Sequence, residues 1–407
     1  MAKQSTGTGI PAIDGGVPAA KDGQYVRFCP PLIEEDDLQA VSSALKSGWI
    51  STGAKAREFE AAFGKYVGAK CALGLNSCTA GLHLALLAHG IGQGDEVLVP
   101  AMTFAATANV VEVAGARPVF VDSEPDTFNI DPARMAEKIT ARTKAAIPVH
   151  FGGLPCEMDE IRKICSERGI ALVEDCAHAT GTRYRGKRMG SSDNLSCFSF
   201  YPTKNMTTIE GGMVTGADEE LIAKMRVMSL HGMSKDAYKR FSREGVAHYE
   251  IEMPGFKYNM TDVSAALGLS QLKKIGRFNA VREKYAKYLF DALSGAPGII
   301  LPPKPRAHAG HSWHLFQLMT DPEKTRITRD RMLEALAKEN VGTGVHYRSL
   351  HVHRFYREKY GLRKEDCPRA AFISDNVFSI PFSHSMDERE LEIVADAVLK
   401  IARHYKK

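Results

Sequence analysis

The first half of the chain alternates between short apolar runs and longer amphipathic ones. From Ile33 to about Leu230, runs typical of buried strands are followed by stretches with apolar residues three or four positions apart. Short strands joined by helices of about ten residues or more are typical of a mostly parallel sheet with helices on both faces. The pattern therefore predicts an α/β protein, with strands at 71–77, 96–100, 117–122, 145–150 and 170–175 and helices at 34–48, 78–90, 103–115, 131–139 and 157–169.

The pattern changes after residue 254. Residues 260–294 form one long helical pattern, and a smaller α+β region is expected after Pro302 and Pro303. In that region we expect strands at 312–320 and 342–350 and helices at 329–341 and 386–405. The predicted divisions are a loose Gly/Ala-rich arm (1–24), a large domain (25–255), a bridging helix region (256–294) and a small C-terminal domain (295–407).

Composition and charge narrow the class of protein. A chain of 407 residues is too long for one simple hydrophobic core, so a large domain and a smaller one are expected. Its contents of 44% hydrophobic and 25% charged residues are ordinary for a soluble globular protein. No run of about 18 apolar residues predicts a membrane span, and the N-terminus lacks the apolar core of a secretory signal, so a cytoplasmic location is expected. The formal net charge of +5 comes from interleaved acids and bases, which predicts no nucleic-acid partner but is compatible with a small anion.

The eight cysteines are scattered, and no two form a CxxC pair. Several lie in apolar, strand-like runs. This usage favours packed free thiols in a reducing compartment over disulfides, and it predicts no metal site.

A first candidate site lies in NSCTAGLH, residues 76–83, where a predicted strand passes into a helix. Ligands of open parallel sheets bind beyond the carboxyl ends of the strands, and the positive end of a helix favours a phosphate. Ser77, Cys78 and Thr79 are therefore candidates for phosphate binding. The alternative is an ordinary helix N-cap made by Ser77 or Thr79. The segment matches neither the Walker loop nor the dinucleotide fingerprint.

A second candidate lies in LVEDCAHATG, residues 172–181. Asp175 closes an apolar strand, where a carboxylate could hold a protonated ring nitrogen. Alternatively, Asp175 caps the next turn. His178 follows three positions later, and a lone histidine at such a place also fits a purely structural role.

The third candidate is Lys204, in the stretch FSFYPTKNMTTIEGG of residues 198–212. A lysine partly removed from water has a lowered pKa, because desolvation disfavours the ammonium form. Its neutral amine can form a Schiff base with an aldehyde. A lysine that extends from a strand end toward solvent is the alternative.

Taken together, these candidates fit pyridoxal phosphate. That cofactor needs a phosphate site, a carboxylate for its pyridine nitrogen and a lysine. Phe104, at the start of a predicted helix, could stack on the ring, although a core position is the alternative for this side chain.

Three separated segments, 173–191, 198–214 and 254–272, closely resemble the DegT/DnrJ/StrS sugar aminotransferases. The resemblance extends from about Pro30 to Tyr405 and includes residues 47–53 and 91–104. It implies the aspartate aminotransferase-like (type I) fold, with a mostly parallel seven-stranded sheet in the large domain and a smaller C-terminal α+β domain. Residues 312–318 and 342–361 resemble the UDP-4-amino-4-deoxy-L-arabinose synthase subgroup.

The resemblance implies a role for each cofactor-binding residue. Lys204 would be the catalytic residue that bonds to the cofactor and then shuttles a proton. Asp175 would pair with the pyridinium nitrogen, His178 would lie beside the ring hydroxyl, and Phe104 would stack on the ring.

The phosphate would be bound by Ser199, by the backbone near Ser77 and Cys78, and by the Thr79 hydroxyl. Asn259 would reach the phosphate from the other subunit of a homodimer, so that each active site is shared between two chains. Four residues are candidates for the substrate side of the site: Trp49, Ser51, His346 and Tyr347. Cys78 and the pair Tyr201-Pro202 depart from the pattern of the relatives.

The resemblance implies ping-pong transamination from an amino acid, by family habit L-glutamate, to a keto sugar on a nucleoside diphosphate. Such a product serves amino-sugar and polysaccharide biosynthesis, for which lipopolysaccharide, another surface glycan and a secondary metabolite stay open. One alternative is a sugar dehydratase of the same family, in which histidine replaces the lysine. Others are a non-catalytic ligand sensor on the same fold and a nucleotide-binding protein without pyridoxal phosphate, for which we find no glycine-rich phosphate loop.

Overall fold

The computed structural model describes residues 9–21, 23–233 and 249–407. Its large domain contains a seven-stranded sheet with the order β1-β9-β8-β5-β4-β2-β3. β9 is antiparallel to both of its neighbours and the other pairs are parallel, which confirms the predicted mostly parallel sheet. The strands are β1 (Cys71–Leu75), β2 (Glu96–Pro100), β3 (Arg117–Val121), β4 (Thr143–Ala146), β5 (Ala171–Asp175), β8 (Leu195–Ser199) and β9 (Gly212–Gly216).

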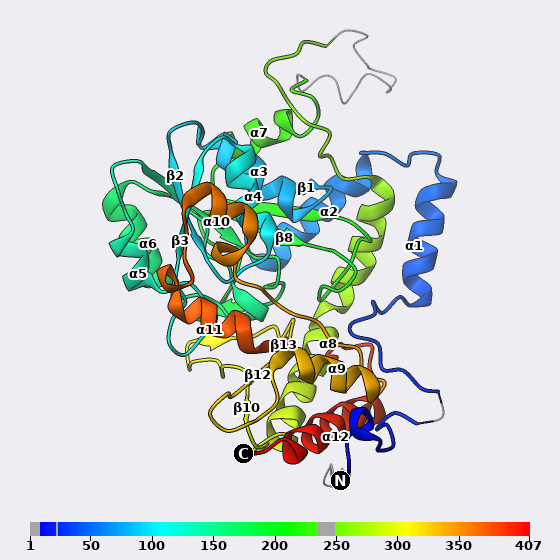
Figure 1. Ribbon diagram of the computed structural model, residues 1–407. Helices are drawn as coiled ribbons and strands as arrows, with labels where there is room; N and C mark the ends of the chain where they lie inside the picture. Colours follow the sequence, from blue (N-terminus) through cyan, green and yellow to red (C-terminus); the bar gives the residue numbers. More distant parts are fainter. Residues whose placement is uncertain (1–8, 22, 234–248) are drawn as a thin grey trace.

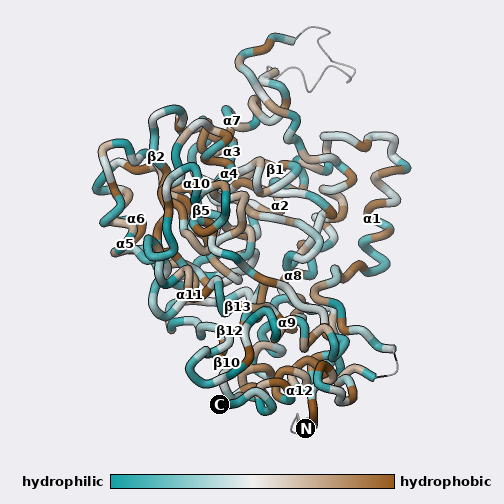
Figure 2. The backbone as a smooth tube through the Cα atoms, viewed as in Figure 1, coloured by the Kyte–Doolittle hydropathy of each residue, from teal (hydrophilic) through white to brown (hydrophobic). Residues whose placement is uncertain are grey.

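Helices cover both faces of this sheet (Figure 1). Successive strand residues point to opposite faces, so Val97 and Val99 pack with α3, α4 and α7, whereas Leu98 packs with α2, α5 and α6. Figure 2 shows hydrophobic positions gathered along the strands, while α1, outside the sheet, carries long hydrophilic stretches. The helices are α1 (Glu35–Lys46), α2 (Ala54–Val67), α3 (Cys78–Ala88), α4 (Ala105–Val113), α5 (Pro132–Glu137), α6 (Met158–Arg168) and α7 (Glu219–Met228).

The long helix α8 (Asp262–Ala292) connects the two domains, as Figure 1 shows. Its first half packs on the large domain through Ala265 and Ile275, and its second half enters the small-domain core through Tyr285 and Leu289. The small domain also contains β10 (Ile299–Ile300), β12 (Gln317–Thr320), β13 (Val377–Ser379), α9 (Arg329–Lys338) and α12 (Glu388–His404). Among the helices of the described residues, none combines the length and apolar character needed to cross a membrane.

Two helices from the C-terminal part of the chain pack on the large domain. They are α10 (Arg354–Tyr360) and α11 (Pro368–Asn376). The Tyr356 ring lies 5.1 Å from the Phe120 ring, and the Ala370 N–H donates to Asp122 Oδ1 at 2.7 Å. The range 295–407, which we expected to form the small domain, thus contributes elements to both.

The described part of the N-terminal arm, residues 9–21, is held by the small domain, although we expected a loose arm. Glu339 accepts hydrogen bonds from the backbone N–H groups of Ala12 (2.9 Å) and Ala19 (2.6 Å). Lys400 pairs with Glu339 at 2.6 Å and also donates to the Val17 carbonyl. Residues 1–8 and 22 of the predicted arm lie outside the described residues.

Two predicted strands differ from the structure in the small domain. The strand expected at 312–320 begins only at Gln317, because Trp313 has a left-handed backbone (φ 49°) that no strand accommodates. The segment 342–350 forms only an isolated bridge from Gly344 to Ser379 in place of the expected strand. Two short strand pairings and four short 3-10 segments complete the described elements: β6 (Arg183–Tyr184), β7 (Lys187–Arg188), β11 (Ala309–Gly310), η1 (Ala12–Asp14), η2 (Phe151–Gly153), η4 (Leu350–Val352) and η5 (Lys364–Asp366).

Candidate active site

A cavity of about 420 Å³ lies at the carboxyl ends of β5 and β8, at the edge of the sheet where ligands of such folds bind. It brings together residues that are far apart in the sequence, from five segments of the large domain and one after α9. Ten of the residues predicted from the sequence line it: Ser77, Cys78, Thr79, Phe104, Asp175, His178, Ser199, Lys204, His346 and Tyr347.

The N-terminus of α3 forms one wall of the cavity. Ser77 is the N-cap and accepts a hydrogen bond from the Ala80 N–H at 3.1 Å, so the capping role considered for Ser77 is present. The N–H groups of Cys78 and Thr79 stand in the first turn, before any intrahelical acceptor, and so can bind an anion. Capping by Ser77 and anion binding by the two N–H groups are therefore compatible.

Asp175 is buried at the end of β5. Its Oδ1 accepts from the Ala177 N–H at 3.0 Å, and its Oδ2 accepts from the Thr107 hydroxyl at 2.9 Å. Burial raises the pKa of Asp175, while these two hydrogen bonds and the charge of Lys204 act in the opposite direction. The hydrogen bond from Ala177 is the turn cap that was the alternative role for Asp175. The carboxylate makes this bond while it lines the cavity.

Lys204 lies in a turn after β8, in which its N–H donates to the Tyr201 carbonyl at 2.9 Å. Burial lowers the pKa of its amine to about 8, against the opposing charge of Asp175. Within the described part of the chain, the amine has neither a hydrogen bond nor an ion pair. The lowered pKa makes the neutral form of this amine easier to reach, and the neutral form is the one that bonds to an aldehyde.

An aromatic group lies beside this amine. Phe104 is the N-cap residue of α4 and is 59% exposed, so its ring is a cavity surface and not a core side chain. The Tyr347 ring lies 5.7 Å from it, and the Tyr347 hydroxyl lies 3.1 Å from His178 Nε2. His178 Nδ1 accepts from the Gly152 N–H, so Nε2 carries the proton of the neutral ring and donates it to Tyr347. Burial holds the pKa of His178 well below its usual range, in accord with a neutral ring.

His346 closes the cavity from the small-domain side. Its ring stacks on Phe28 at 5.3 Å, and its Nδ1 lies 2.9 Å from the Ser379 hydroxyl. Burial, with the charge of Lys204 as a second cause, lowers the pKa of His346 to about 4. The ring is therefore neutral at pH 7.

Three predicted residues do not line this cavity. Asn259 bridges to Leu75 of the edge strand β1, and its side chain donates to the Thr52 hydroxyl at 2.5 Å. Trp49 and Ser51 belong to the same loop as Thr52, and Trp49 is 44% exposed. The structure thus groups these three residues on the surface beside β1, outside the cavity of their own chain.

The sequence reasoning missed other residues of the site. Thr103 and Glu210 line the cavity, and Thr107 contacts Asp175 from behind it. The two threonines could have been recognised from the sequence, because positions 103 and 107 are one helical turn apart and lie on either side of Phe104.

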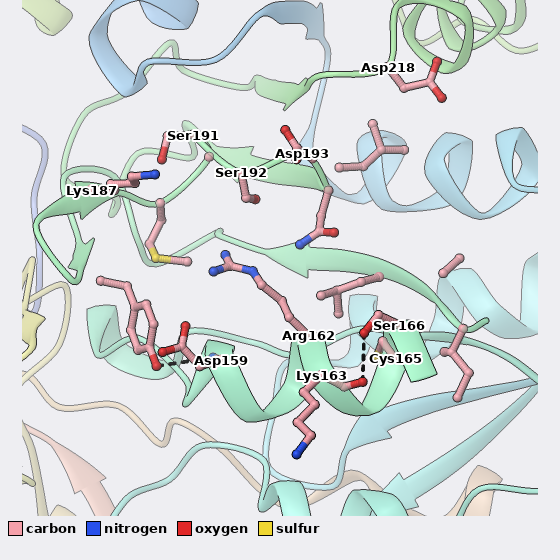
Figure 3. A pocket seen from close by; sticks show the side chains of 18 of the residues that line it. Asp159, Arg162, Lys163, Cys165, Ser166, Lys187, Ser191, Ser192, Asp193 and Asp218 are labelled. Carbon is pink, nitrogen blue, oxygen red and sulfur yellow. Dashed lines mark hydrogen bonds between the residues drawn. The ribbon is translucent and has the colours of Figure 1, made fainter. Parts of the chain in front are cut away.

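A larger cavity, about 820 Å³, lies at the opposite edge of the sheet, where β5 and β8 begin (Figure 3). Arg162 extends into it from α6 but donates to Glu174 at 3.1 Å, and Arg185 pairs with Asp159 at 2.5 Å. Two of its arginines are thus already paired, and the cavity lies away from the ligand-binding edge of the fold. We therefore place the chemistry in the smaller cavity.

Three buried side chains with metal-ligand atoms, His150, Glu174 and Cys176, lie within 4.8 Å of one another. The side-chain polar atoms of His150 and Glu174 already have partners. His150 Nδ1 accepts from the Cys156 N–H, so Nε2 carries a proton toward Glu174 at 3.2 Å. Burial alone would raise the pKa of Glu174, but the hydrogen bond from His150 and the charge of Arg162 lower it to about 2. These contacts form a buried hydrogen-bond network around the ion pair of Arg162 and Glu174.

The groups that line the smaller cavity fit the chemistry of pyridoxal phosphate. Gly212, where β9 begins, lies so close to the start of α3 that a Cβ there would be 2.3 Å from the Ser77 carbonyl carbon. The α3 N-terminus, the Asp175 carboxylate, the Lys204 amine and the Phe104 ring then face one space. These are the donor, acceptor, amine and aromatic groups that the phosphate, pyridine nitrogen, aldehyde and ring of the cofactor require.

Comparison with known proteins agrees with this site. Residues 31–399 match the model of the DegT/DnrJ/EryC1/StrS aminotransferase family. The chain is 44% identical over 384 residues to the spore coat polysaccharide biosynthesis protein SpsC of Bacillus subtilis, covering 94% of this chain and 98% of that protein. It is 45% identical over 377 residues to the uncharacterized protein MJ1066 of Methanocaldococcus jannaschii, covering 92% and 97%.

Among solved structures, the chain is similar to the putative sugar aminotransferase Spr1654 from Streptococcus pneumoniae. The PLP form of that protein matches with a TM-score of 0.87 and 30% identity, over 94% of this chain and 99% of that one. Its PMP form matches with a TM-score of 0.86. The fold is thus the type I fold expected from the sequence. The chain belongs to the DegT/DnrJ/EryC1/StrS aminotransferase family and is an aminotransferase with pyridoxal phosphate as its cofactor.

Proposed function

We propose that this aminotransferase transfers an amino group from L-glutamate to a keto sugar carried on a nucleoside diphosphate. The observation that carries the proposal is the Lys204 amine, which has no partner among the described residues and has its pKa lowered to about 8, in one cavity with Asp175 and the N-terminus of α3. The sugar is supported by the relatives: SpsC is named for spore coat polysaccharide biosynthesis, and a 27% identical structure is titled Helicobacter pylori PseC, an aminotransferase involved in pseudoaminic acid biosynthesis.

The residues of the cavity divide the work between binding and proton transfer. When bound, pyridoxal phosphate supplies an electron sink for the carbon that gains or loses the amino group. Lys204 Nζ moves a proton at that carbon in both half-reactions. Asp175 accepts from the protonated ring nitrogen, and Phe104 and His178 orient the ring.

The phosphate is held at the N-terminus of α3. The N–H groups of Cys78 and Thr79 donate to it, together with the hydroxyls of Thr79 and Ser199. Since Cys78 contributes its N–H, its thiol does not prevent phosphate binding at this position.

The acceptor binds at the mouth of the cavity, beyond the cofactor. The residues that line the cavity there include His346, Tyr347 and Tyr201, of which Tyr201 is 48% exposed. Neutral His346 offers a hydrogen bond to a sugar hydroxyl without attracting a second anion. The narrower resemblance of residues 312–318 and 342–361 to the UDP-4-amino-4-deoxy-L-arabinose synthase subgroup makes a UDP-linked 4-keto sugar the first acceptor to test.

The proposed enzyme is a homodimer with shared active sites. Asn259, Trp49 and Ser51 lie beside β1, outside their own cavity, where a second chain can place its own site against them. Trp49 (44% exposed) and Ile50 (52% exposed) form an apolar surface there that a second copy would bury. This arrangement is the one in which Asn259 reaches the phosphate of the partner.

The alternative functions have less support. Membership of an aminotransferase family and the residues that line the cavity both disfavour a non-catalytic sensor. They also disfavour a nucleotide-binding protein without pyridoxal phosphate. The sugar dehydratases of the family have histidine where this chain has Lys204. Retention of the lysine favours amino transfer.

The two half-reactions can be tested separately. Protein loaded with pyridoxal phosphate and given only L-glutamate is expected to release 2-oxoglutarate in a single turnover, and Lys204→Ala is expected to release none. A panel of UDP-linked, dTDP-linked and free 4-keto sugars then identifies the acceptor by mass spectrometry of the amino product. Turnover of 2-keto acids alone, with every nucleotide sugar left unchanged, would contradict the proposed acceptor class while leaving the aminotransferase assignment intact.

A further inference from the structure

Two threonine hydroxyls connect α4 to the carboxylate at the end of β5. Thr107 Oγ1 lies 2.9 Å from Asp175 Oδ2 and 2.9 Å from Thr103 Oγ1. Thr107 is 0% exposed and Thr103 is 2% exposed, so both hydroxyls are shielded from bulk water. An ionised carboxylate only accepts hydrogen bonds, so Thr107 donates to Asp175 and its own oxygen accepts from Thr103.

The other contacts of Asp175 are on its second oxygen. Oδ1 accepts from the Ala177 N–H at 3.0 Å and lies 3.9 Å from the Cys78 sulfur. A thiol is a weak donor, and this contact is long. Among the described residues, Thr107 therefore supplies the short side-chain hydrogen bond to Asp175, and it is the contact that sets the position of Oδ2.

We propose that Thr107 is a positioning residue for Asp175: its hydroxyl fixes the rotation of the carboxylate that holds the ring nitrogen of pyridoxal phosphate, and Thr103 orients that hydroxyl. A hydrogen bond to the ionised form of a buried carboxylate also favours that form, and a charged group makes the stronger hydrogen bond. Thr107 is not among the residues that line the cavity, so its effect would pass through Asp175. The inference rests on the cofactor of the family and is independent of the acceptor proposed above.

The test replaces the hydroxyl without changing the shape of the side chain. Thr107→Val removes the donor, and Thr107→Ser keeps it. Thr215→Val is the matched control, because Thr215 is equally buried and its hydroxyl donates to the Gly190 carbonyl at 3.0 Å, away from the cavity. The measured quantities are the dissociation constant of pyridoxal phosphate, from an absorbance titration of cofactor-free protein, and kcat and KM for L-glutamate.

Thr107→Val is expected to bind the cofactor about tenfold more weakly and to lose kcat with little change in KM, because the bond acts on the ring nitrogen and not on the donor substrate. Thr107→Ser is expected to stay close to the wild type. Thr215→Val is expected to lose thermal stability while its cofactor dissociation constant stays unchanged.

A double-mutant cycle shows whether Thr107 acts through Asp175. Once Asp175→Asn has removed the carboxylate, adding Thr107→Val is expected to change cofactor binding no further. Fully additive losses, or wild-type binding and kcat in Thr107→Val, overturn the inference. If Thr107→Val does not fold, Thr103→Val replaces it, with a smaller loss in the same direction expected and no loss overturning the inference. A wild-type protein that binds no pyridoxal phosphate overturns the cofactor assignment as well.

Discussion

Gly212 lies directly against the peptide bond that joins Ser77 to Cys78. A Cβ at position 212 would be 2.3 Å from the Ser77 carbonyl carbon and 2.5 Å from the Cys78 nitrogen, far inside van der Waals contact. Because β9 begins at Gly212 and α3 begins at Cys78, this contact sets how closely the Lys204 loop approaches the phosphate end of the site.

Gly212→Ala is expected to push the start of α3 away from β9. We expect the dissociation constant of pyridoxal phosphate to rise at least tenfold and the free energy of unfolding to fall by about 1–3 kcal/mol, as overpacking does. Gly276→Ala is the control, since position 276 in α8 is exposed and has no atom within 4 Å of an added Cβ. That variant should bind the cofactor normally. A Gly212→Ala protein with wild-type binding would show that the helix end is not the phosphate site.

The half-buried Lys204 is expected to cost stability in a pH-dependent way. Burial lowers the pKa of Lys204 to about 8, so between that pH and the ordinary value of 10.5 the folded, cofactor-free protein binds fewer protons here than the unfolded chain. The penalty is fully present below pH 8 and disappears as the pH rises through 10.5. Lys204→Met should therefore unfold at a higher temperature than the wild type at pH 7, with the difference shrinking toward pH 10. A difference that is constant across this range would contradict the lowered pKa.

Ile209 is expected to store backbone strain. It is a β-branched residue with a left-handed backbone (φ 71°), and its side chain is 57% exposed, so little packing offsets the strain. Ile209→Gly should raise the free energy of unfolding by about 1 kcal/mol. Asn340→Gly is the contrasting variant, since asparagine tolerates φ 60° and its side chain donates to the Ala20 carbonyl at 3.0 Å. It should lose stability. Urea unfolding of both variants gives the comparison.

The buried pair Glu339 and Lys400 is expected to anchor the N-terminal segment. Glu339→Ala leaves Lys400 buried without its carboxylate and removes the acceptor for Ala12 and Ala19, so we expect a loss of about 3–5 kcal/mol. Proteolysis within residues 9–21 should accelerate in parallel. Glu388→Ala breaks the exposed pair with Lys284 and should cost less than about 1 kcal/mol. Equal losses in the two variants would mean that burial of the Glu339 pair has no special effect.

The proposed sharing of active sites between two chains predicts complementation between inactive proteins. Lys204→Ala and Asn259→Ala proteins, mixed under conditions that exchange subunits, should recover activity, because each heterodimer contains one site with both native residues. Each parent protein measured alone supplies the baseline. Confirmed subunit exchange without recovery would exclude the role of Asn259 in the partner site.

Much of the site could be predicted because its residues follow directly on recognisable strands. Asp175 ends an apolar strand and Cys78 begins a helix, so their common edge follows from the topology of a parallel sheet. The position of Lys204 could be predicted in the same way, because this residue closely follows β8. The roles of these residues in binding and catalysis stay predictions, since the structure shows their positions and not their chemistry.

The positions that could not be predicted depend on contacts between distant segments. Thr107 lies in a helix that reads as an ordinary amphipathic element, and its role becomes visible only when α4 packs beside β5. Similarly, the pattern of 342–350 resembles a strand because the segment is partly buried, although it pairs only at Gly344. Periodicity reports burial, and burial alone does not distinguish a paired strand from a packed loop.

The reversed direction of β9 has a consequence for the order in which the protein folds. Every parallel pair in the sheet joins strands separated by a crossover, whereas β8 and β9 are joined by residues 200–211 alone. Contacts of such short sequence separation close with a small entropic cost, so we expect this hairpin to form early. Lys204 would then lie between its two strands while the ribosome is still synthesising the C-terminal domain.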